Sequence, residues 1–165
     1  MTNAIEVRYA RPNDVEAILD LFEEVADELL WIGPEPGFDR DRKRASFLDA
    51  IARPDELPFW VACDGAGLAG SASIFHHAEA GLAIGMLVRA SYRRRGIGQA
   101  LIERSFTWAR DHGVGALSLH VFPHNLAARA LYQKAGFREI DRFERDITRQ
   151  TGDVWDTILM RKEFA

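Results

Sequence analysis

The sequence predicts an α/β domain in which a mixed sheet has helices on both faces, and three observations support this prediction. The length of 165 residues suits one domain with a sizeable core. The composition, 47% hydrophobic and 28% charged, is typical of a soluble globular protein. Segments with strand-like alternation are interleaved with segments of helical spacing in the order β-αα-βββ-α-β-α-ββ. We therefore expect one domain over residues 1–165.

The expected elements follow one another through connections rich in Gly, Pro, Asn and Asp, including hairpin turns at 65–67 and 76–81. Alternating or continuous apolar residues mark the strands, and apolar residues at helical spacing mark the helices. Strands are expected at residues 5–9, 57–64, 68–75, 82–88, 114–121, 137–147 and 154–162. Helices are expected at residues 15–29, 39–52, 96–112 and 125–135.

The strand at residues 82–88 is apolar almost throughout, which favours a central position covered on both faces. Gly85 within it indicates either a bulge or a place where another group approaches the backbone closely.

A basic, glycine-containing loop follows this strand. It reads Arg93-Arg94-Arg95-Gly96-Ile97-Gly98 and runs directly into an amphipathic helix. Its glycines permit left-handed or crowded backbone, so that successive N–H groups can point into one small volume. The first turn of a helix adds unpaired N–H donors and the positive end of the helix dipole, which together suit a phosphate. With the charge of three arginines, the loop predicts a pyrophosphate cradle, although a solvated turn has a similar composition.

The identity of the cradle depends on its spacing. No Lys-Ser or Lys-Thr follows the glycines, so the Walker pattern is excluded, and Leu101 stands where the dinucleotide fingerprint needs its third glycine. The spacing Arg93-x-x-Gly96-x-Gly98 resembles the acetyl-coenzyme A signature Q/R-x-x-G-x-G/A of the GNAT superfamily of N-acetyltransferases.

A second segment, residues 120–137, resembles the other GNAT signature, V-x-x-x-N-x-x-A-x-x-x-Y-x-x-x-G-F. Every fixed position is filled, namely by Val121, Asn125, Ala128, Tyr132, Gly136 and Phe137. The two signatures together identify the chain as a member of the superfamily. The resemblance implies a largely antiparallel central sheet of about seven strands flanked by about four helices. It also implies acetyl-CoA as the co-substrate.

The resemblance further implies which residues bind the coenzyme. Its pantetheine arm pairs with the bulged, splayed strand that includes Met86, and its diphosphate lies on the basic loop. Candidate coenzyme-binding residues are Met86, Leu87, Val88, Arg93, Arg94, Arg95, Gly96, Ile97, Gly98, Gln99 and Asn125.

Asn125 and Tyr132 are seven residues apart, which places them within ~20° of the same helix face. From the residues alone, Asn125 is equally well a helix N-cap and Tyr132 a core aromatic. The resemblance implies that Asn125 contacts the coenzyme arm and that the Tyr132 phenol is the general acid beside the thioester sulfur.

Acetyl transfer to an amine also needs a base, because an ammonium group has no lone pair. His120 lies where some similar enzymes carry a glutamate base, and an imidazole with a pKa near 6.5 suits this role at neutral pH. The alternative is that His120 only lies on the polar face of its strand. His76, His77 and Glu79 are lesser candidates.

The C-terminal segment bears on the acceptor. Gly152, Asp156 and Met160 fit the G-x-x-x-D-x-x-x-M ending of GNAT members that acetylate amino acids or protein N-termini. A primary amine of a small molecule or amino acid is therefore the first expectation for the acceptor, and a protein N-terminus or lysine is the alternative. A non-catalytic acyl-CoA-binding sensor is a further alternative, against which the presence of Tyr132 argues.

The break between the first two helices, residues 31–38, contains two Gly, two Pro and two large aromatics. It is interpreted as either a substrate lip or a plain connecting loop. Glu28, just before this break, and Glu35, within it, are candidates for binding a substrate cation.

Composition narrows the partners and the compartment. A net charge of −4 argues against a nucleic-acid partner, in spite of the local arginines. A single cysteine, Cys63, excludes an internal disulfide and fits a reducing cytoplasm. No signal peptide or bilayer-spanning stretch is found, so no membrane partner is expected. We expect a cytoplasmic acetyltransferase without a metal site, and a possible homodimer through the last strands.

Overall fold

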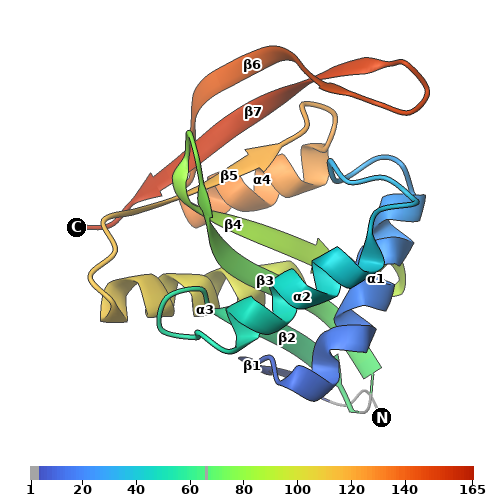
Figure 1. Ribbon diagram of the computed structural model, residues 1–165. Helices are drawn as coiled ribbons and strands as arrows, with labels where there is room; N and C mark the ends of the chain where they lie inside the picture. The colour runs from blue at the N-terminus through green and yellow to red at the C-terminus, as the bar shows by residue number, and fades with distance from the viewer. Residues whose placement is uncertain (1–3, 66) are drawn as a thin grey trace.

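The computed structural model describes residues 4–65 and 67–165, and it has the expected order of elements (Figure 1). The strands are β1 (Ile5–Tyr9), β2 (Phe59–Asp64), β3 (Gly67–His77), β4 (Gly81–Val88), β5 (Ala116–Val121), β6 (Arg138–Thr148) and β7 (Val154–Glu163). The helices are α1 (Val15–Asp27), α2 (Arg40–Ile51), α3 (Ile97–Asp111) and α4 (Leu126–Ala135), with short 3-10 turns at Pro12–Asp14 and Ala90–Tyr92. Ala66, in the expected turn at 65–67, lies outside the described residues.

The strands form one sheet in the order β1-β2-β3-β4-β5-β7-β6, and neighbouring strands are antiparallel except β4 and β5. The predicted mixed, largely antiparallel sheet is therefore confirmed. In the described chain, the parallel ladder between β4 and β5 consists of one pair, Ala83 with Ser118. Beyond this pair, the edge of β4 that faces β5 lacks a strand partner, and we call this opening the β4–β5 split.

Helices cover both faces of the sheet, as expected. On one face, α3 and α4 pack over a core that includes Ile97, Leu101 and Tyr132. On the other face, α1 and α2 pack over a smaller core that includes Ile18 and Ile51. Full burial of an aliphatic side chain such as Leu101 contributes roughly 1.5–3 kcal/mol, so each helix is fixed to the sheet mainly by its apolar face.

The helix α1 ends earlier than its apolar spacing predicts, at Asp27 rather than Leu29. Leu29 has a φ of +59°, which is outside the helical region, and its carbonyl accepts a hydrogen bond from Arg149 Nη2 at 3.3 Å. A contact with a distant part of the chain therefore accompanies the end of the helix, and spacing within the helix cannot reveal such a contact.

The helices α1 and α2 are joined by ion pairs as well as by an aromatic contact between Phe22 and Phe47, whose ring centres are 5.9 Å apart. Arg40 on α2 forms ion pairs with Glu16, Asp20 and Glu23 on α1, at 3.2, 2.6 and 2.8 Å respectively. The Asp39 side chain caps α2 by accepting from the Arg42 N–H at 2.9 Å. Across residues 4–65 and 67–165, no helix combines the length and apolarity needed to cross a membrane.

Candidate active site

The loop before α3 has the backbone expected of an anion cradle. Arg94 and Gly96 have φ values of +64° and +79°, so the chain turns sharply twice before α3 begins at Ile97. The first helical hydrogen bond joins the Ala100 N–H to the Gly96 carbonyl at 3.0 Å. The N–H groups of residues 94–99 find no hydrogen-bond acceptor among the residues that the structure describes. They precede or open a helix of 15 residues, so the helix dipole adds to their positive field.

The backbone at Gly98 is closely packed by two neighbouring side chains. A Cβ there would lie 2.9 Å from Leu131 Cδ2 on α4 and 3.4 Å from Met86 Cε on β4. The first turn of α3 therefore lies close against both α4 and β4, and the cradle opens directly beside the β4–β5 split.

The three arginines of the loop have different surroundings. The Arg93 side chain is turned away from the cradle: its Nε donates to the Val88 carbonyl at 3.1 Å, and its two Nη groups donate to the carboxylate of Glu28. The Arg95 guanidinium lies 5.0 Å from the centre of the Tyr92 ring. Arg94 and Arg95 are exposed. Of the three side chains, Arg93 is the one fixed by protein contacts.

The edge of β4 next to the cradle offers free main-chain groups. Met86, Leu87 and Val88 pair with β3 on one side, and they have no strand partner among the described residues on the other. They are partly exposed, which makes this edge available for strand-like pairing with an extended ligand.

Asn125 and Tyr132 occupy the start and middle of α4. The Asn125 side chain accepts from the Ala128 N–H at 3.2 Å, so Asn125 is the N-cap, and its amide NH₂ is not used in that bond. Tyr132 is buried, with its ring 5.9 Å from that of Phe137. Burial raises the pKa of Tyr132 to about 12, so its phenol remains protonated at neutral pH.

His120 lies on the opposite face of the sheet from Tyr132. Leu119 and Val121 belong to the core under α3 and α4, and side chains alternate along a strand, so His120 points to the other face. Because Ala83 pairs with Ser118, Gly85 lies across the split from His120 on this same face. The split therefore has the Tyr132 helix on one face and His120 on the other.

The surroundings of His120 keep its imidazole neutral. Its ring centre lies 4.5 Å from that of His77 and 5.9 Å from that of Phe143. Burial lowers the pKa of His120, and His77 acts in the same direction, whereas Asp146 and Glu79 oppose them. A neutral imidazole at physiological pH has a free lone pair, which a general base requires.

His77 itself has a structural contact. Its Nδ1 accepts from the backbone N–H groups of Glu79 and Ala80, each at 3.3 Å, so the proton of the ring is on Nε2. His76 and Glu79 are exposed on the same β3–β4 hairpin. Of these lesser base candidates, His77 is the one whose ring the structure brings against His120.

The two glutamates proposed as substrate-cation ligands are both occupied by the protein. Glu28 accepts from Arg93 and from Trp31 Nε1, the latter at 2.6 Å. Glu35 pairs with Arg149 at 3.3 Å and accepts from the Gln150 N–H at 2.9 Å. The structure does not support their assignment to a substrate cation, because their charges are already paired across the fold.

Arg149 is a residue whose position the sequence did not indicate. It is 4% exposed, and its Nη1 donates to the carbonyls of Ile32 and Gly33, each at 3.0 Å. Its guanidinium lies 4.4 Å from the Trp155 ring centre. A lone arginine beside a turn carries no sequence signal, yet it joins the α1–α2 loop to the turn between β6 and β7.

Aromatic residues gather where these two loops meet the end of β5. The His124 ring stacks on Phe122 at 5.4 Å and meets Trp155 edge-on at 4.8 Å. His124 Nε2 lies 2.7 Å from the Leu30 carbonyl, and Trp31 is 6.1 Å away, ring to ring. The aromatic break thus packs against His124, in the segment that follows β5, rather than forming an isolated loop.

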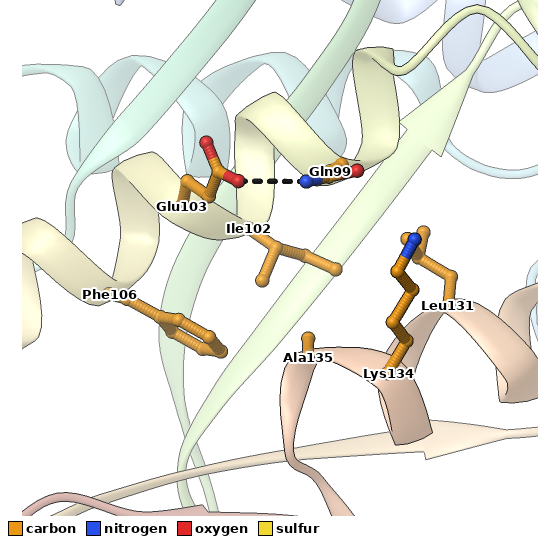
Figure 2. A pocket seen from close by; sticks show the side chains of 7 residues that line it. All are labelled: Gln99, Ile102, Glu103, Phe106, Leu131, Lys134 and Ala135. Atoms are coloured by element: carbon orange, nitrogen blue, oxygen red, sulfur yellow. Dashed lines mark hydrogen bonds between the residues drawn. The ribbon is translucent and has the colours of Figure 1, made fainter.

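A cavity of about 240 Å³ lies between α3 and α4 (Figure 2). It is lined by Gln99, Ile102, Glu103, Phe106, Leu131, Lys134 and Ala135. Figure 2 shows Gln99 at the cradle end of this cavity, where its Nε2 donates to Glu103 Oε1 at 3.0 Å. Neither Tyr132 nor His120 lines it, so it adjoins the cradle and not the split.

The chain is similar to known acetyltransferases in its sequence and in its fold. The model of the Acetyltransferase (GNAT) family matches residues 18–137. A ribosomal-protein-alanine N-acetyltransferase from Brucella melitensis has a similar structure, with a TM-score of 0.86 and 24% identity, covering 96% of this chain and 99% of that one. The putative acetyltransferase yncA from Salmonella typhimurium, solved with acetyl-CoA, has a TM-score of 0.86 and 19% identity, covering 99% and 95%.

Sequence relatives match over short segments. The uncharacterized N-acetyltransferase YycN of Bacillus subtilis is 44% identical over 50 residues, which are 30% of this chain and 32% of that protein. GCN5-related N-acetyltransferase 4 of Arabidopsis thaliana is 42% identical over 53 residues, 32% of this chain and 18% of that protein. The matched segments thus span a third or less of these relatives. The family match, by contrast, covers most of this chain and agrees with the fold, and the chain belongs to the acetyltransferase (GNAT) family.

Proposed function

We propose that the protein transfers the acetyl group of acetyl-CoA to a primary amine of a small molecule or amino acid. The observation that carries this proposal is the run of free N–H groups at residues 94–99. These groups lie beside the β4–β5 split, which has Tyr132 on one face of the sheet and His120 on the other. The family and the neighbour solved with acetyl-CoA support the choice of coenzyme.

The coenzyme fits the chain by its chemistry. The N–H groups of residues 94–99 donate to the diphosphate, and the exposed Arg94 and Arg95 add positive charge. The pantetheine arm, an extended chain with amide groups, pairs with the free edge of Met86–Val88. The amide NH₂ of Asn125, at the N-terminus of α4, is a further donor for this arm.

The reaction uses the two faces of the sheet. A neutral amine approaches from the His120 face and attacks the thioester carbonyl, while His120 takes the proton that the nitrogen loses, directly or through water. Main-chain N–H groups of Met86–Val88 stabilise the oxyanion that forms. The carbon–sulfur bond then breaks, and Tyr132 gives its proton to the departing thiolate. The products are the acetylated amine and the coenzyme thiol.

A protein N-terminus or a lysine is the alternative acceptor. The observation in its favour is the fold shared with the ribosomal-protein-alanine N-acetyltransferase from Brucella melitensis. A non-catalytic acyl-CoA sensor is disfavoured because the split has both a protonated phenol, Tyr132, and a neutral imidazole, His120. Binding of the coenzyme alone needs neither group.

A cytoplasmic location, a single domain over residues 1–165 and a homodimer through the last strands remain predictions. The edge strand β6 is exposed along most of its length, which is compatible with a partner there. Light scattering of the purified protein measures its mass in solution and tests the dimer.

The test of the proposed function is release of the coenzyme thiol from acetyl-CoA in the presence of an amine panel. The panel holds small amines, free amino acids and short peptides with either a free N-terminus or a free lysine. We expect amine-dependent release with the small acceptors. Release with peptides alone supports the alternative acceptor, and binding of acetyl-CoA without release under any amine supports the sensor.

A further inference from the structure

The carboxylate of Glu28 is the one point at which the cradle loop and the α1–α2 loop share a hydrogen-bonding group among the described residues. Arg93 Nη1 donates to Glu28 Oε2 at 2.7 Å, and Arg93 Nη2 donates to Glu28 Oε1 at 2.5 Å. Trp31 Nε1 donates to Oε2 at 2.6 Å. Three donors therefore converge on one carboxylate, which stands at the C-terminal end of α1.

The Arg93 side of this contact belongs to the coenzyme site. Arg93 immediately precedes the free N–H groups, and its Nε donates to the carbonyl of Val88, the last residue of β4. Its guanidinium thus connects the proposed pantetheine edge to Glu28, a residue 65 positions away in sequence. A bidentate arginine–carboxylate pair fixes orientation as well as distance, so Glu28 sets how the loop leaves β4.

The Trp31 side belongs to the acceptor face. Trp31 lies in the α1–α2 loop, in which the carbonyls of Ile32 and Gly33 accept hydrogen bonds from Arg149. The Trp31 ring is near that of His124. Its indole N–H has Glu28 as its partner. Trp31 packs against the core under α1 and α2, which is the face of the sheet from which we propose that the acceptor approaches. A change in the Glu28 carboxylate is therefore transmitted to a loop on the acceptor face.

The Glu28 carboxylate is partly buried, and it is charged at neutral pH. The side chains of Arg93 and Glu28 are 32% and 27% exposed. The hydrogen bonds from Arg93, followed by the one from Trp31, hold the pKa of Glu28 below its usual range, against the effect of burial. The contact consequently persists through neutral pH, unlike most fully exposed ion pairs, which exchange readily with water.

We infer that Glu28 is a positioning residue that couples the coenzyme site to the acceptor site. It touches neither proposed substrate; it fixes Arg93 and Trp31 together, so the two loops adopt their binding conformations as a unit. This inference rests on the proposed function for the identity of the two sites. Coupling between sites is reciprocal, so a change on the acceptor side alters coenzyme affinity as well.

The test is whether Trp31 affects coenzyme binding through Glu28. Trp31→Phe removes the indole N–H and keeps an aromatic ring, and calorimetry with acetyl-CoA measures the result. We expect affinity to fall about threefold in the otherwise unchanged protein, within the range of measured interaction energies for residues in one network. In a Glu28→Gln background, which keeps the side-chain size but breaks the bidentate pair, Trp31→Phe should have little further effect.

The matched control is Glu24→Gln, which lies one turn earlier on α1. Glu24 pairs with Arg89 at 3.1 Å, so this variant also removes an ion pair between α1 and the segment after β4, but without contacting Arg93 or Trp31. In the Glu24→Gln background, Trp31→Phe should still weaken acetyl-CoA binding about threefold. Thermal melting of every variant checks that it is folded, and Glu28→Ala replaces Glu28→Gln if the latter is not.

Three outcomes separate the two proposals. If Trp31→Phe lowers acetyl-CoA affinity equally in the wild-type and Glu28→Gln backgrounds, or does not lower it at all, the coupling is overturned. The proposed function is then left intact. A wild-type protein that binds no acetyl-CoA overturns the proposed function and the coupling with it. A threefold loss that disappears in the Glu28→Gln background, and persists in the Glu24→Gln background, supports the coupling.

Discussion

Tyr132 is the residue that must act as the general acid in the proposed reaction. A phenol with a pKa of about 12 is protonated throughout the physiological range, so it can donate to a thiolate but cannot act as a base. Tyr132→Phe should lower kcat about 10²–10⁴-fold, as loss of a general acid does, while acetyl-CoA affinity changes little. Steady-state kinetics and calorimetry measure the two quantities. Tyr9→Phe on β1, far from the split in sequence and partly exposed, is the matched control.

An unchanged kcat in Tyr132→Phe would remove this residue from the acid role. A parallel loss of kcat and coenzyme affinity would instead assign the hydroxyl to binding.

We propose that His120 is the residue that sets the pH dependence of the reaction. Burial and His77 lower the pKa of His120 below its usual 6.5, so the neutral, active imidazole persists to lower pH than in a free histidine. The acidic limb of kcat/KM should therefore have its midpoint below about 6.5. His120→Gln should abolish this limb and lower the rate, and the exposed His76→Gln should leave both unchanged. An acidic limb that survives in His120→Gln places the base elsewhere.

At the scale of elements, the β3 backbone at Gly70 lies close against β4, the strand that carries the proposed pantetheine edge. A Cβ at Gly70 would lie 2.9 Å from the Leu87 carbonyl oxygen, a backbone atom that cannot rotate away. Gly70→Ala should cost about 1–3 kcal/mol of unfolding free energy, as other over-packing substitutions do. Chemical denaturation measures this loss. Gly115→Ala, where a Cβ meets nothing within 4 Å, is the control and should be neutral or slightly stabilising.

Local elements are where the sequence was most informative. The N-cap at Asn125, the left-handed Gly96 before α3 and the left-handed Gly136 after α4 are set by residues next to them in the chain. The order of elements and the mixed sheet follow from the same local patterns. Strand ends were less predictable: β3 continues to His77, two residues past the expected end, because pairing with Gly81 extends it.

The features that sequence patterns did not reveal depend on contacts between distant segments. Glu28 and Arg93 are 65 residues apart, and Arg149 and Ile32 are 117 apart. Neither pair leaves a trace in local spacing, and as a result two paired glutamates were interpreted as candidates for a substrate cation. The free N–H groups of residues 94–99 could be predicted from glycine spacing, whereas the direction of the Arg93 side chain could not.

At the scale of the whole molecule, Arg149 joins the N-terminal and C-terminal parts of the fold. Its removal leaves Glu35 with an unpaired, mostly buried charge and several loop carbonyls without their donor. Arg149→Ala should therefore reduce the free energy of unfolding by about 3 kcal/mol. Denaturant unfolding measures this change. Arg53→Ala, an exposed arginine with exposed partners, should change stability far less, and equal effects of the two substitutions would contradict the role of Arg149.

In the proposed function, the arrangement as a whole brings two substrates to one split from opposite faces of the sheet. The single ladder pair between β4 and β5 makes the opening, and Tyr132 and His120 lie on its two sides. We propose that the free N–H groups at the start of α3 hold the coenzyme beside it. A crystal structure with acetyl-CoA tests this account most directly. It should show the diphosphate hydrogen-bonded to the N–H groups of residues 94–99 and the thioester sulfur beside the Tyr132 hydroxyl. A diphosphate bound away from that loop, or a thioester remote from Tyr132, would contradict it.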